Sequence, residues 1–381
     1  MLERFRLEPS RAFLHLAVIL IVALWTVPTA GLLVSSLRDK NLIASSGWWN
    51  ALTTSEQSGQ GRMKAPDQQV EKDGHFEIAG NLFEGEKSSG EITAFSTRVQ
   101  QPDQYPAGTT AAYDDGKTLI VNADGSYVYT SPVAFDGKRG QRVFYISKVP
   151  PKFTTENYST VLFSEGIGQS FVNSLTVTIP STIIPILIAA FAAYALAWMK
   201  LPARGLIIAI IVGLLVVPLQ MSLIPLLRLY NMAGSSLSQT YLGIWLAHTG
   251  FGLPFAIYLL RSYIAGLPKD LIESAQVDGA NDFKIFRRII LPLSFPALAS
   301  FAIFQFLWVW NDLLVAMVFL GTAPDKAVLT YKLNSLLGSR GGNWEILTAS
   351  AFITIIVPLA VFFSLQRYFV RGLLAGSVKG G

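Results

Sequence analysis

Cysteine is absent from this chain of 381 residues, and histidine occurs only three times. Without cysteine the chain can form no disulfide, no thiolate metal ligand and no cysteine nucleophile. With no cysteine and so few histidines, we expect no dedicated metal site. We also expect no cofactor. The sequence also shows no spacing of nucleophile and base that is typical of a catalytic site, so we do not expect an enzyme.

Charge is scarce as well. Charged residues make up 14% of the chain, against ~25% in an ordinary soluble domain. The deficit is uneven, because residues 36–165 hold 29 charged residues whereas the other 251 positions hold 26. This distribution excludes a single soluble globule, a disordered chain and a collagen-like fibre. It indicates a membrane protein that carries one soluble-looking insert.

Long uncharged stretches account for the low-charge part. Six stretches contain no Asp, Glu, Lys or Arg: 12–37, 166–199, 205–227, 229–260, 289–311 and 346–366. Each is long enough for a helix of ~20 residues across the hydrocarbon core. We therefore predict an all-α polytopic bundle of six transmembrane helices. The first stretch exceeds the apolar region of a signal peptide, so we expect an uncleaved span.

Basic residues near the span ends predict the orientation. With the N-terminus inside, 13 Lys and Arg lie on the inner side and four lie in the short outer loops. Both termini are therefore expected in the cytoplasm and the insert outside. The net charge of +5 reflects this inner bias and does not indicate nucleic-acid binding.

These spans divide the chain into four parts. Residues 1–37 hold the cytoplasmic N-terminus and first helix, and residues 38–165 form the extracytoplasmic insert. Residues 166–370 form a membrane core of five helices, and residues 371–381 form a cytoplasmic tail.

The insert is predicted to be β-rich. Alternating side chains favour strands at 75–79, 92–98, 117–122, 126–130 and 141–148, with a hairpin at Asp124-Gly125. Four or five strands of this kind form a small sheet or sandwich, and the Gly/Ser/Thr/Gln-rich residues 45–65 are expected to be a loop or linker. Gly116-Lys117-Thr118 resembles the end of a phosphate loop, but Ala111 stands where the first glycine is needed. The insert is either a docking surface or cap over a pore, or a decoration without a mechanistic role.

Charge concentrates again in the inner loop at residues 262–292. Pro268 is typical of a helix start, and the following helix has Leu271, Ile272 and Ala275 on one side. Gly279 supplies a turn, and Asp282 is expected to cap a second helix that ends near Pro292. The loop is thus predicted to be an amphipathic helix–glycine–helix elbow. The residues alone leave open an ordinary interfacial connector.

One motif in this loop carries a resemblance. Glu273-Ser274-Ala275, three residues, Gly279, nine residues and Ile289-x-Leu291-Pro292 resemble the EAA signature of ABC-importer permeases. That signature reads Glu-Ala-Ala, three residues, Gly, nine residues, Ile-x-Leu-Pro. The spacing agrees at every step, and the one departure is Ser274 in place of the first alanine.

Further segments resemble the carbohydrate branch of that family, the maltose-type second permease subunit. They are Ala275–Ala280, Phe171–Leu175, Trp310-Asn311-Asp312 and the tail Gln366–Gly380. The resemblance covers residues 1–50 and 150–381. The size of the insert and Ser46-Gly47-Trp48-Trp49 resemble the α-glucoside subgroup.

The resemblance implies a fold, partners and a location. It implies an ABC type I importer permease in a bacterial cytoplasmic (inner) membrane, which carries a carbohydrate and hydrolyses no ATP itself. The implied partners are a cytoplasmic ATPase dimer, a second permease subunit as heterodimer and an extracytoplasmic sugar-binding protein. The residues that match the ATPase-coupling motif are Glu273, Ser274, Ala275, Asp278, Gly279, Leu291 and Pro292.

Polar residues at membrane depth are candidates for the substrate path, because leaving them in lipid is costly. These candidates are Gln220, Gln305, Trp308, Asn311 and Asp312. Hydrogen-bonding and aromatic side chains of this kind suit a sugar, but interhelical hydrogen bonds use the same residue types. We expect His248 to be a packed or hydrogen-bonded residue rather than a ligand.

Two other classes of protein remain as alternatives. A secondary, ion-coupled transporter usually has more spans and ionisable residues in mid-bilayer, and mid-span charges are nearly absent here. A membrane-anchored sensor requires a sizeable cytoplasmic module, and no inner loop is long enough to hold one. The sugar itself is not determined by these residues.

Overall fold

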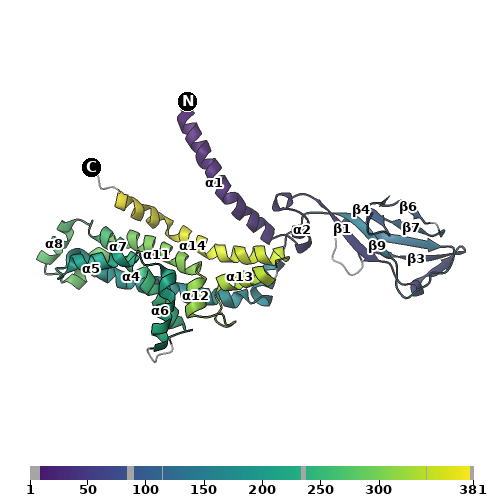
Figure 1. Cartoon of the computed structure of the whole chain (residues 1–381). Helices are drawn as coiled ribbons and strands as arrows, with labels where there is room; N and C mark the ends of the chain where they lie inside the picture. The colour runs from purple at the N-terminus through teal and green to yellow at the C-terminus, as the bar shows by residue number, and fades with distance from the viewer. Residues whose placement is uncertain (1–8, 84–89, 114, 233–236, 340, 378–381) are drawn as a thin grey trace. The chain divides into compact units, whose positions relative to one another are not determined.

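The computed structural model describes residues 9–83, 90–113, 115–232, 237–339 and 341–377. The chain divides into two compact units, of which the first ends at Asn157 and the second begins at Tyr158. The first unit holds one long helix and the β-strands, and the second is helical (Figure 1).

The first unit begins with three helices. They are α1 (Pro9–Ser36), α2 (Lys40–Ser45) and the 3₁₀-helix η2 (Trp48–Asn50). Residues 11–36 of α1 are long and apolar enough to cross a membrane.

Arg38, which is 2% exposed, fastens the turn after α1. Its guanidinium donates hydrogen bonds to the carbonyls of Ser46 (2.8 Å), Gly47 (3.0 Å) and Leu42 (3.0 Å) and to Ser46 Oγ (2.6 Å). Burial lowers the pKa of this guanidinium. Asn157 Nδ2 donates to the carbonyls of Ser36 (2.9 Å) and Arg38 (2.8 Å) from the far end of the unit. The entry to the insert and its exit are thus tied together.

Nine strands follow within the described part of residues 55–149. They are β1 (Ser55–Arg62), β2 (Val70–Lys72), β3 (His75–Asn81), β4 (Glu91–Ser96), β5 (Tyr105–Pro106), β6 (Thr110–Ala112), β7 (Thr118–Val121), β8 (Ser126–Ser131) and β9 (Arg142–Val149), with the 3₁₀-helix η3 (Pro66–Gln68). They form two antiparallel sheets of order β1-β9-β4-β5 and β2-β3-β8-β7-β6. One apolar cluster, which includes Phe95, Leu119 and Val143, draws on both sheets, so they pack as a sandwich.

The expectation of a loop at residues 45–65 is wrong for most of that stretch. Residues 55–62 form β1, which pairs with β9 over its whole length. The strand contains few apolar side chains, so its sequence lacks the alternation that predicts a strand. Backbone pairing holds it in place, and Gly59 leaves room for the ring of Tyr145, because a Cβ at Gly59 would lie 2.4 Å from that ring.

The remaining helices belong mainly to the second unit. They are α3 (Glu156–Ser159), the π-helix η4 (Thr160–Ser164), α4 (Ile167–Trp198), α5 (Arg204–Leu214), α6 (Leu219–Met232), α7 (Tyr241–Ile264), α8 (Lys269–Val277), α9 (Asp282–Ile285), the π-helix η5 (Phe286–Ile290), α10 (Leu291–Leu293), α11 (Phe295–Trp310), α12 (Leu314–Phe319), α13 (Leu329–Ser339) and α14 (Trp344–Ser377). Within this unit α8 lies at one end and α13 at the other (Figure 1).

By length and composition, four of the described helices can cross a membrane. They are α1, α4, α7 and α14. Two further stretches that the sequence predicts as spans are bent pairs: α5 and α6 meet at 104°, and the residues from α9 to α10 meet α11 at 69°. Pro218 lies in the first break, and Pro292 and Pro296 flank the second. Proline removes a backbone donor, so a break of the helix at these points is expected.

Candidate functional site

Helix α8 ends in a hydrogen-bonding pattern that fixes a sharp turn. The N–H of Gly279 donates to the carbonyl of Gln276 (3.0 Å), and the N–H of Ala280 donates to that of Ala275 (2.9 Å). These two bonds form a Schellman motif, which requires a left-handed residue after the helix. Gly279 takes that conformation, with φ +74°, as the sequence predicts for this turn.

The second helix of the elbow begins one residue earlier than predicted. Asn281 is the N-cap of α9, and its side chain accepts a hydrogen bond from the N–H of Lys284 (2.9 Å). The prediction of Asp282 as the cap is wrong, because the extended backbone that a cap needs lies at Asn281. Asp282 Oδ1 instead accepts a hydrogen bond from the hydroxyl of Tyr194 in α4 (3.0 Å).

The side of the elbow that faces the helix bundle is part of the core of the helical unit. Ile272, Ile285 and Phe286 lie in one apolar cluster with residues of α4, α7 and α11. The ring of Phe286 stacks on that of Phe191 in α4 at 4.5 Å. Leu271, predicted on one side of the helix with Ile272 and Ala275, is 44% exposed, because the helical turn places Ile272 and not Leu271 toward the bundle. These contacts join the elbow directly to α4, α7 and α11.

The side of α8 that faces away from the helix bundle carries an exposed ion pair. Lys269 Nζ lies 2.5 Å from Glu273 Oε1, and both side chains are more than half exposed. The hydrogen bond from Lys269 to Glu273 raises the pKa of Lys269. Exposed pairs of this kind contribute little to stability because solvent screens them, so Glu273 can exchange this partner at low cost.

Two large apolar side chains are exposed beside this pair. Val277 is 88% exposed and Phe283 is 62% exposed. The exposed side chains of the elbow thus include one carboxylate, Glu273, and two apolar groups, Val277 and Phe283.

Most of the other residues of the motif form a hydrogen bond within α8, cap that helix or pack near the core. Ser274 Oγ donates to the carbonyl of Asp270 (2.6 Å), so the hydroxyl that replaces an alanine is satisfied within its own helix. Asp278 is the C-cap of α8. Leu291 and Ala275 are half-buried against the core of the unit, and Pro292 is exposed in the first turn of α10.

The proposed path residues occupy different environments. Gln305 is 3% exposed, and its Nε2 donates to the carbonyls of Ser181 in α4 (3.1 Å) and His248 in α7 (3.5 Å). Gly252 makes room for it, because a Cβ there would lie 2.5 Å from Gln305 Oε1. Gln305 thus bonds three helices together.

The remaining four candidates are less buried. Trp308 is half-buried and contacts the ring of His248 edge-on at 5.4 Å. Asn311 is exposed and donates to the carbonyl of Leu307 (2.8 Å). Asp312 Oδ2 accepts from the N–H of Ala316 (3.1 Å), and Gln220 is exposed on α6.

Sequence reasoning missed the residues that anchor the elbow. Tyr194 and Phe191 lie on α4, about ninety positions before their partners Asp282 and Phe286, and no local pattern indicates such a contact. Asn281 was detectable, because it precedes Asp282 and has the same capping preference. Among the residues that the structure describes, no group of three His, Asp or Glu is arranged to hold a metal ion.

Replacing Tyr194 with phenylalanine should loosen the elbow without unfolding the unit. The variant removes the hydroxyl that donates to Asp282 Oδ1. The loss of this hydrogen bond should lower the local stability of the elbow by ~1 kcal/mol. We expect amide hydrogen exchange in residues 282–290 to become about fivefold faster. The matched control is Tyr230→Phe, which removes a buried hydrogen bond to the carbonyl of Gly243 (3.0 Å). Equal acceleration of residues 282–290 in both variants would contradict the anchoring role.

The chain is similar to known transport proteins. A family model described as "Binding-protein-dependent transport system inner membrane component" matches residues 167–374. The α-glucoside transport system permease protein AglG of Rhizobium meliloti is 63% identical over 379 residues, which cover 99% of each chain. The osmoprotective compounds uptake permease protein GgtD of Synechocystis is 63% identical over 228 residues, 60% of this chain and 76% of that protein. The glucose import system permease protein GlcU of Saccharolobus solfataricus is 35% identical over 242 residues, 61% of this chain and 83% of that protein.

Proposed function

Because the chain belongs to the family of binding-protein-dependent transport system inner membrane components, we propose that it forms half of the pore of an ATP-driven α-glucoside importer. It is a permease subunit for sugar import and not an enzyme, since ATP is hydrolysed on a separate ATPase. The α-glucoside class is supported by the relative from Rhizobium meliloti, whose similarity includes the insert because it covers 99% of each chain.

The observation that carries the coupling role is the continuity between the elbow and the bundle core. Ile272 and Phe286 are buried with residues of α4, α7 and α11, while Glu273, Val277 and Phe283 face outward. A helix with an exposed carboxylate and apolar groups suits a groove on a partner protein. An ATPase that contacts this face differently in its open and closed states would shift the equilibrium between inward- and outward-open bundles.

The membrane arrangement is part of the proposal. The four long helices, with each bent pair counted as one span, would cross the membrane six times. The excess of basic residues predicts that both termini and the elbow lie in the cytoplasm and the β-sandwich outside. The partners would be an ATPase dimer, a second permease subunit and an external sugar-binding protein.

We further propose that Trp308, Asn311, Asp312 and Gln220 face the substrate path. Trp308 retains exposed ring surface for a sugar, and Asn311 and Gln220 are exposed polar groups. Gln305 has the same chemistry, but its amide is committed to the carbonyls of Ser181 and His248. Its role is therefore to hold three helices together beside that path.

Replacing Glu273 with alanine should weaken the association of the ATPase with the purified permease. Removal of a charged group from a buried interface pair costs ~2–5 kcal/mol, so we expect at least a thirtyfold loss of affinity. The measurement is copurification and titration of the ATPase with the two permease subunits in lipid nanodiscs.

The matched control is Lys269→Ala, which breaks the same surface ion pair but keeps the carboxylate. If Glu273 served only that ion pair, both variants would change the affinity for the ATPase equally and only slightly. Equal affinities for the ATPase in the two variants would therefore reject Glu273 as a coupling contact. Isolation of the chain as an active transporter without any ATPase would reject the proposed function.

A further inference from the structure

The β-sandwich contains a cleft that the coupling mechanism does not use. Its volume is about 380 Å³, at the lower end of the ~300–1,000 Å³ of small-molecule sites. All its lining residues lie between positions 63 and 141 of the first unit. The lining combines aromatic, charged and amide groups: Asp115, Lys117, Tyr129, Phe135, Arg139 and Gln141.

The loop that forms one wall of the cleft is held in place by its own hydrogen bonds. Ser131 Oγ donates to the carbonyl of Val133 (2.6 Å) and accepts from its N–H (3.2 Å). The Gln69 side chain accepts from the N–H of Phe135 (2.8 Å) and donates to its carbonyl (3.4 Å). Because both ends of this short segment are fixed, the wall is preorganised rather than formed on binding.

Two aromatic rings provide the apolar part of the lining. Tyr129 of β8 and Phe135 lie 4.7 Å apart with an angle of 32° between their planes. Both are half-buried, so each keeps some ring surface toward the cleft. Exposed ring surface of this kind can pack against the C–H groups of a sugar ring.

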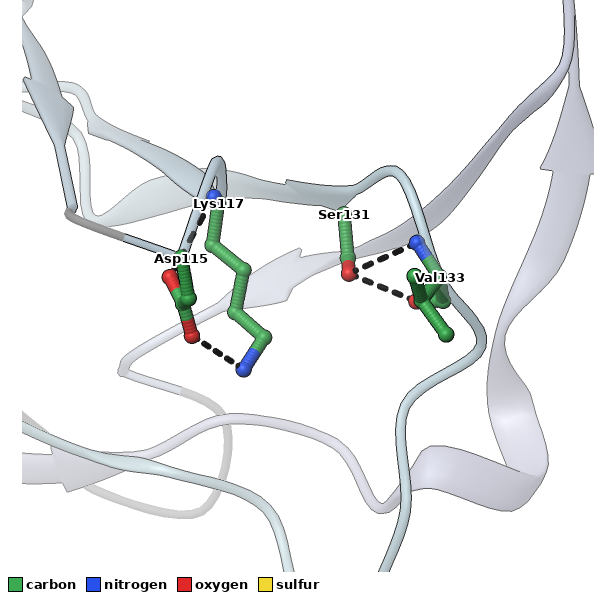
Figure 2. A network of polar contacts seen from close by, with 4 residues as sticks. All are labelled: Asp115, Lys117, Ser131 and Val133. Atoms are coloured by element: carbon green, nitrogen blue, oxygen red, sulfur yellow. Dashed lines mark hydrogen bonds and ion pairs between the residues drawn. The ribbon is translucent and has the colours of Figure 1, made fainter.

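An ion pair provides part of the polar lining. Lys117 Nζ lies 2.5 Å from Asp115 Oδ2, and its hydrogen bond lowers the pKa of Asp115, so the carboxylate stays ionised. Figure 2 shows this pair and the Ser131–Val133 turn projecting to the same side of the ribbon. The pair presents both a donor and an acceptor to the cleft.

The remaining charges are nearly balanced. Lys117 is paired with Asp115. The other charged residues of the lining are Lys64, Arg139 and Asp136, and Gln141 is uncharged. A strongly charged ligand would therefore meet like charge on one side of the cleft. A neutral ligand with many hydroxyl groups matches both the donors and the acceptors.

We propose that this cleft is a carbohydrate subsite that binds a short neutral sugar of one or two rings. The proposal rests on the proposed function, which supplies α-glucosides as the sugars to which the chain is exposed. Tyr129 and Phe135 contact the apolar face of the sugar, and Asp115, Lys117, Arg139 and Gln141 bind its hydroxyls. The subsite holds transported sugar on the permease itself, in the unit that contains the β-sandwich.

The test is binding of maltose to the full chain, measured by saturation-transfer difference NMR. The chain is placed in lipid nanodiscs, because maltoside detergents carry the same sugar. The double variant Arg139→Ala/Gln141→Ala should weaken maltose binding at least about tenfold, since it removes two polar contacts of which one is charged. Ala134→Trp, which places a large side chain in the lining, should abolish binding.

The matched control is Arg98→Ala/Gln101→Ala, the same residue types at exposed positions outside the cleft. It should leave maltose binding unchanged. Three results would each overturn the subsite. They are no saturation transfer to maltose with the unmodified chain, equal losses of maltose binding in the two double variants, and full maltose binding in Ala134→Trp.

Uptake by the assembled importer separates this inference from the proposed function. If ATP-driven maltose uptake occurs but the cleft variants bind maltose normally, the subsite is wrong and the importer assignment stands. If no sugar is taken up but Ala134→Trp removes maltose binding, the subsite stands and the importer assignment is wrong.

Discussion

Replacing Gly279 with valine should reduce ATP-driven uptake about five- to thirtyfold while the chain remains folded. Gly279 has φ +74°, and a side chain in the left-handed region costs ~1–2 kcal/mol. That strain opposes the Schellman turn that sets the direction of α8 relative to α9. The measurement is uptake of radiolabelled maltose by proteoliposomes that contain the complete importer.

The control for this variant is Gly279→Asn, because asparagine tolerates the left-handed conformation better than a β-branched residue. Apart from the neighbouring residues 278 and 280, no described residue has an atom within 4 Å of a Cβ placed at position 279, so a clash with a packed side chain of this chain does not explain a loss. Uptake should therefore be largely retained in Gly279→Asn. Normal uptake in Gly279→Val would show that the turn is not required. Equal losses of uptake in both variants would instead indicate that any side chain at position 279 clashes with a partner protein.

Replacing Arg38 with leucine should detach the start of the insert from its fixed position. The four hydrogen bonds of the guanidinium end at Leu42, Ser46 and Gly47, and hydrogen bonds to charged groups are worth ~1.5–3 kcal/mol each. Because these carbonyls keep other partners, we expect the local stability of residues 42–51 to fall by ~3 kcal/mol. Amide exchange in residues 42–51 should then become about a hundredfold faster.

Arg62→Leu is the matched control for this prediction. Arg62 is exposed and donates one hydrogen bond, to the carbonyl of Gly140 (3.1 Å), so its loss should leave amide exchange in residues 42–51 unchanged, because this bond does not end there. Arg38→Lys should give an intermediate result, because a single ammonium cannot reach the carbonyls that the planar guanidinium bridges. Unchanged exchange in Arg38→Leu would mean that α2 is stable without this side chain.

Local backbone requirements explain why the elbow could be recognised from the sequence. A turn that needs a left-handed residue selects glycine, so Gly279 indicates its own conformation. The start of the next helix was missed by one residue because Asn281 and Asp282 have the same preference for the cap position. Only the path of the backbone into α9 distinguishes them.

Contacts between distant residues explain most of what the sequence did not predict. Strand β1 lacks apolar alternation, and its pairing with β9 joins residues 55–62 to residues 142–149. The anchoring of Asp282 by Tyr194 and the close approach of Gly252 to Gln305 also join separate helices. No local propensity encodes such pairings, because they depend on which elements the rest of the fold brings together.

The sequence by itself determined the membrane character of the chain, the position of the glycine turn and the motif that resembles an importer's coupling loop. These features follow from local composition and backbone preferences, which act over a few residues. Only the tertiary structure decided which face of α8 is buried, which caps and anchors hold the elbow, and which path candidate bonds three helices together. The physical reason is that burial and hydrogen bonding between helices depend on packing, and packing satisfies Gln305 and Asp282 with partners far away in the chain.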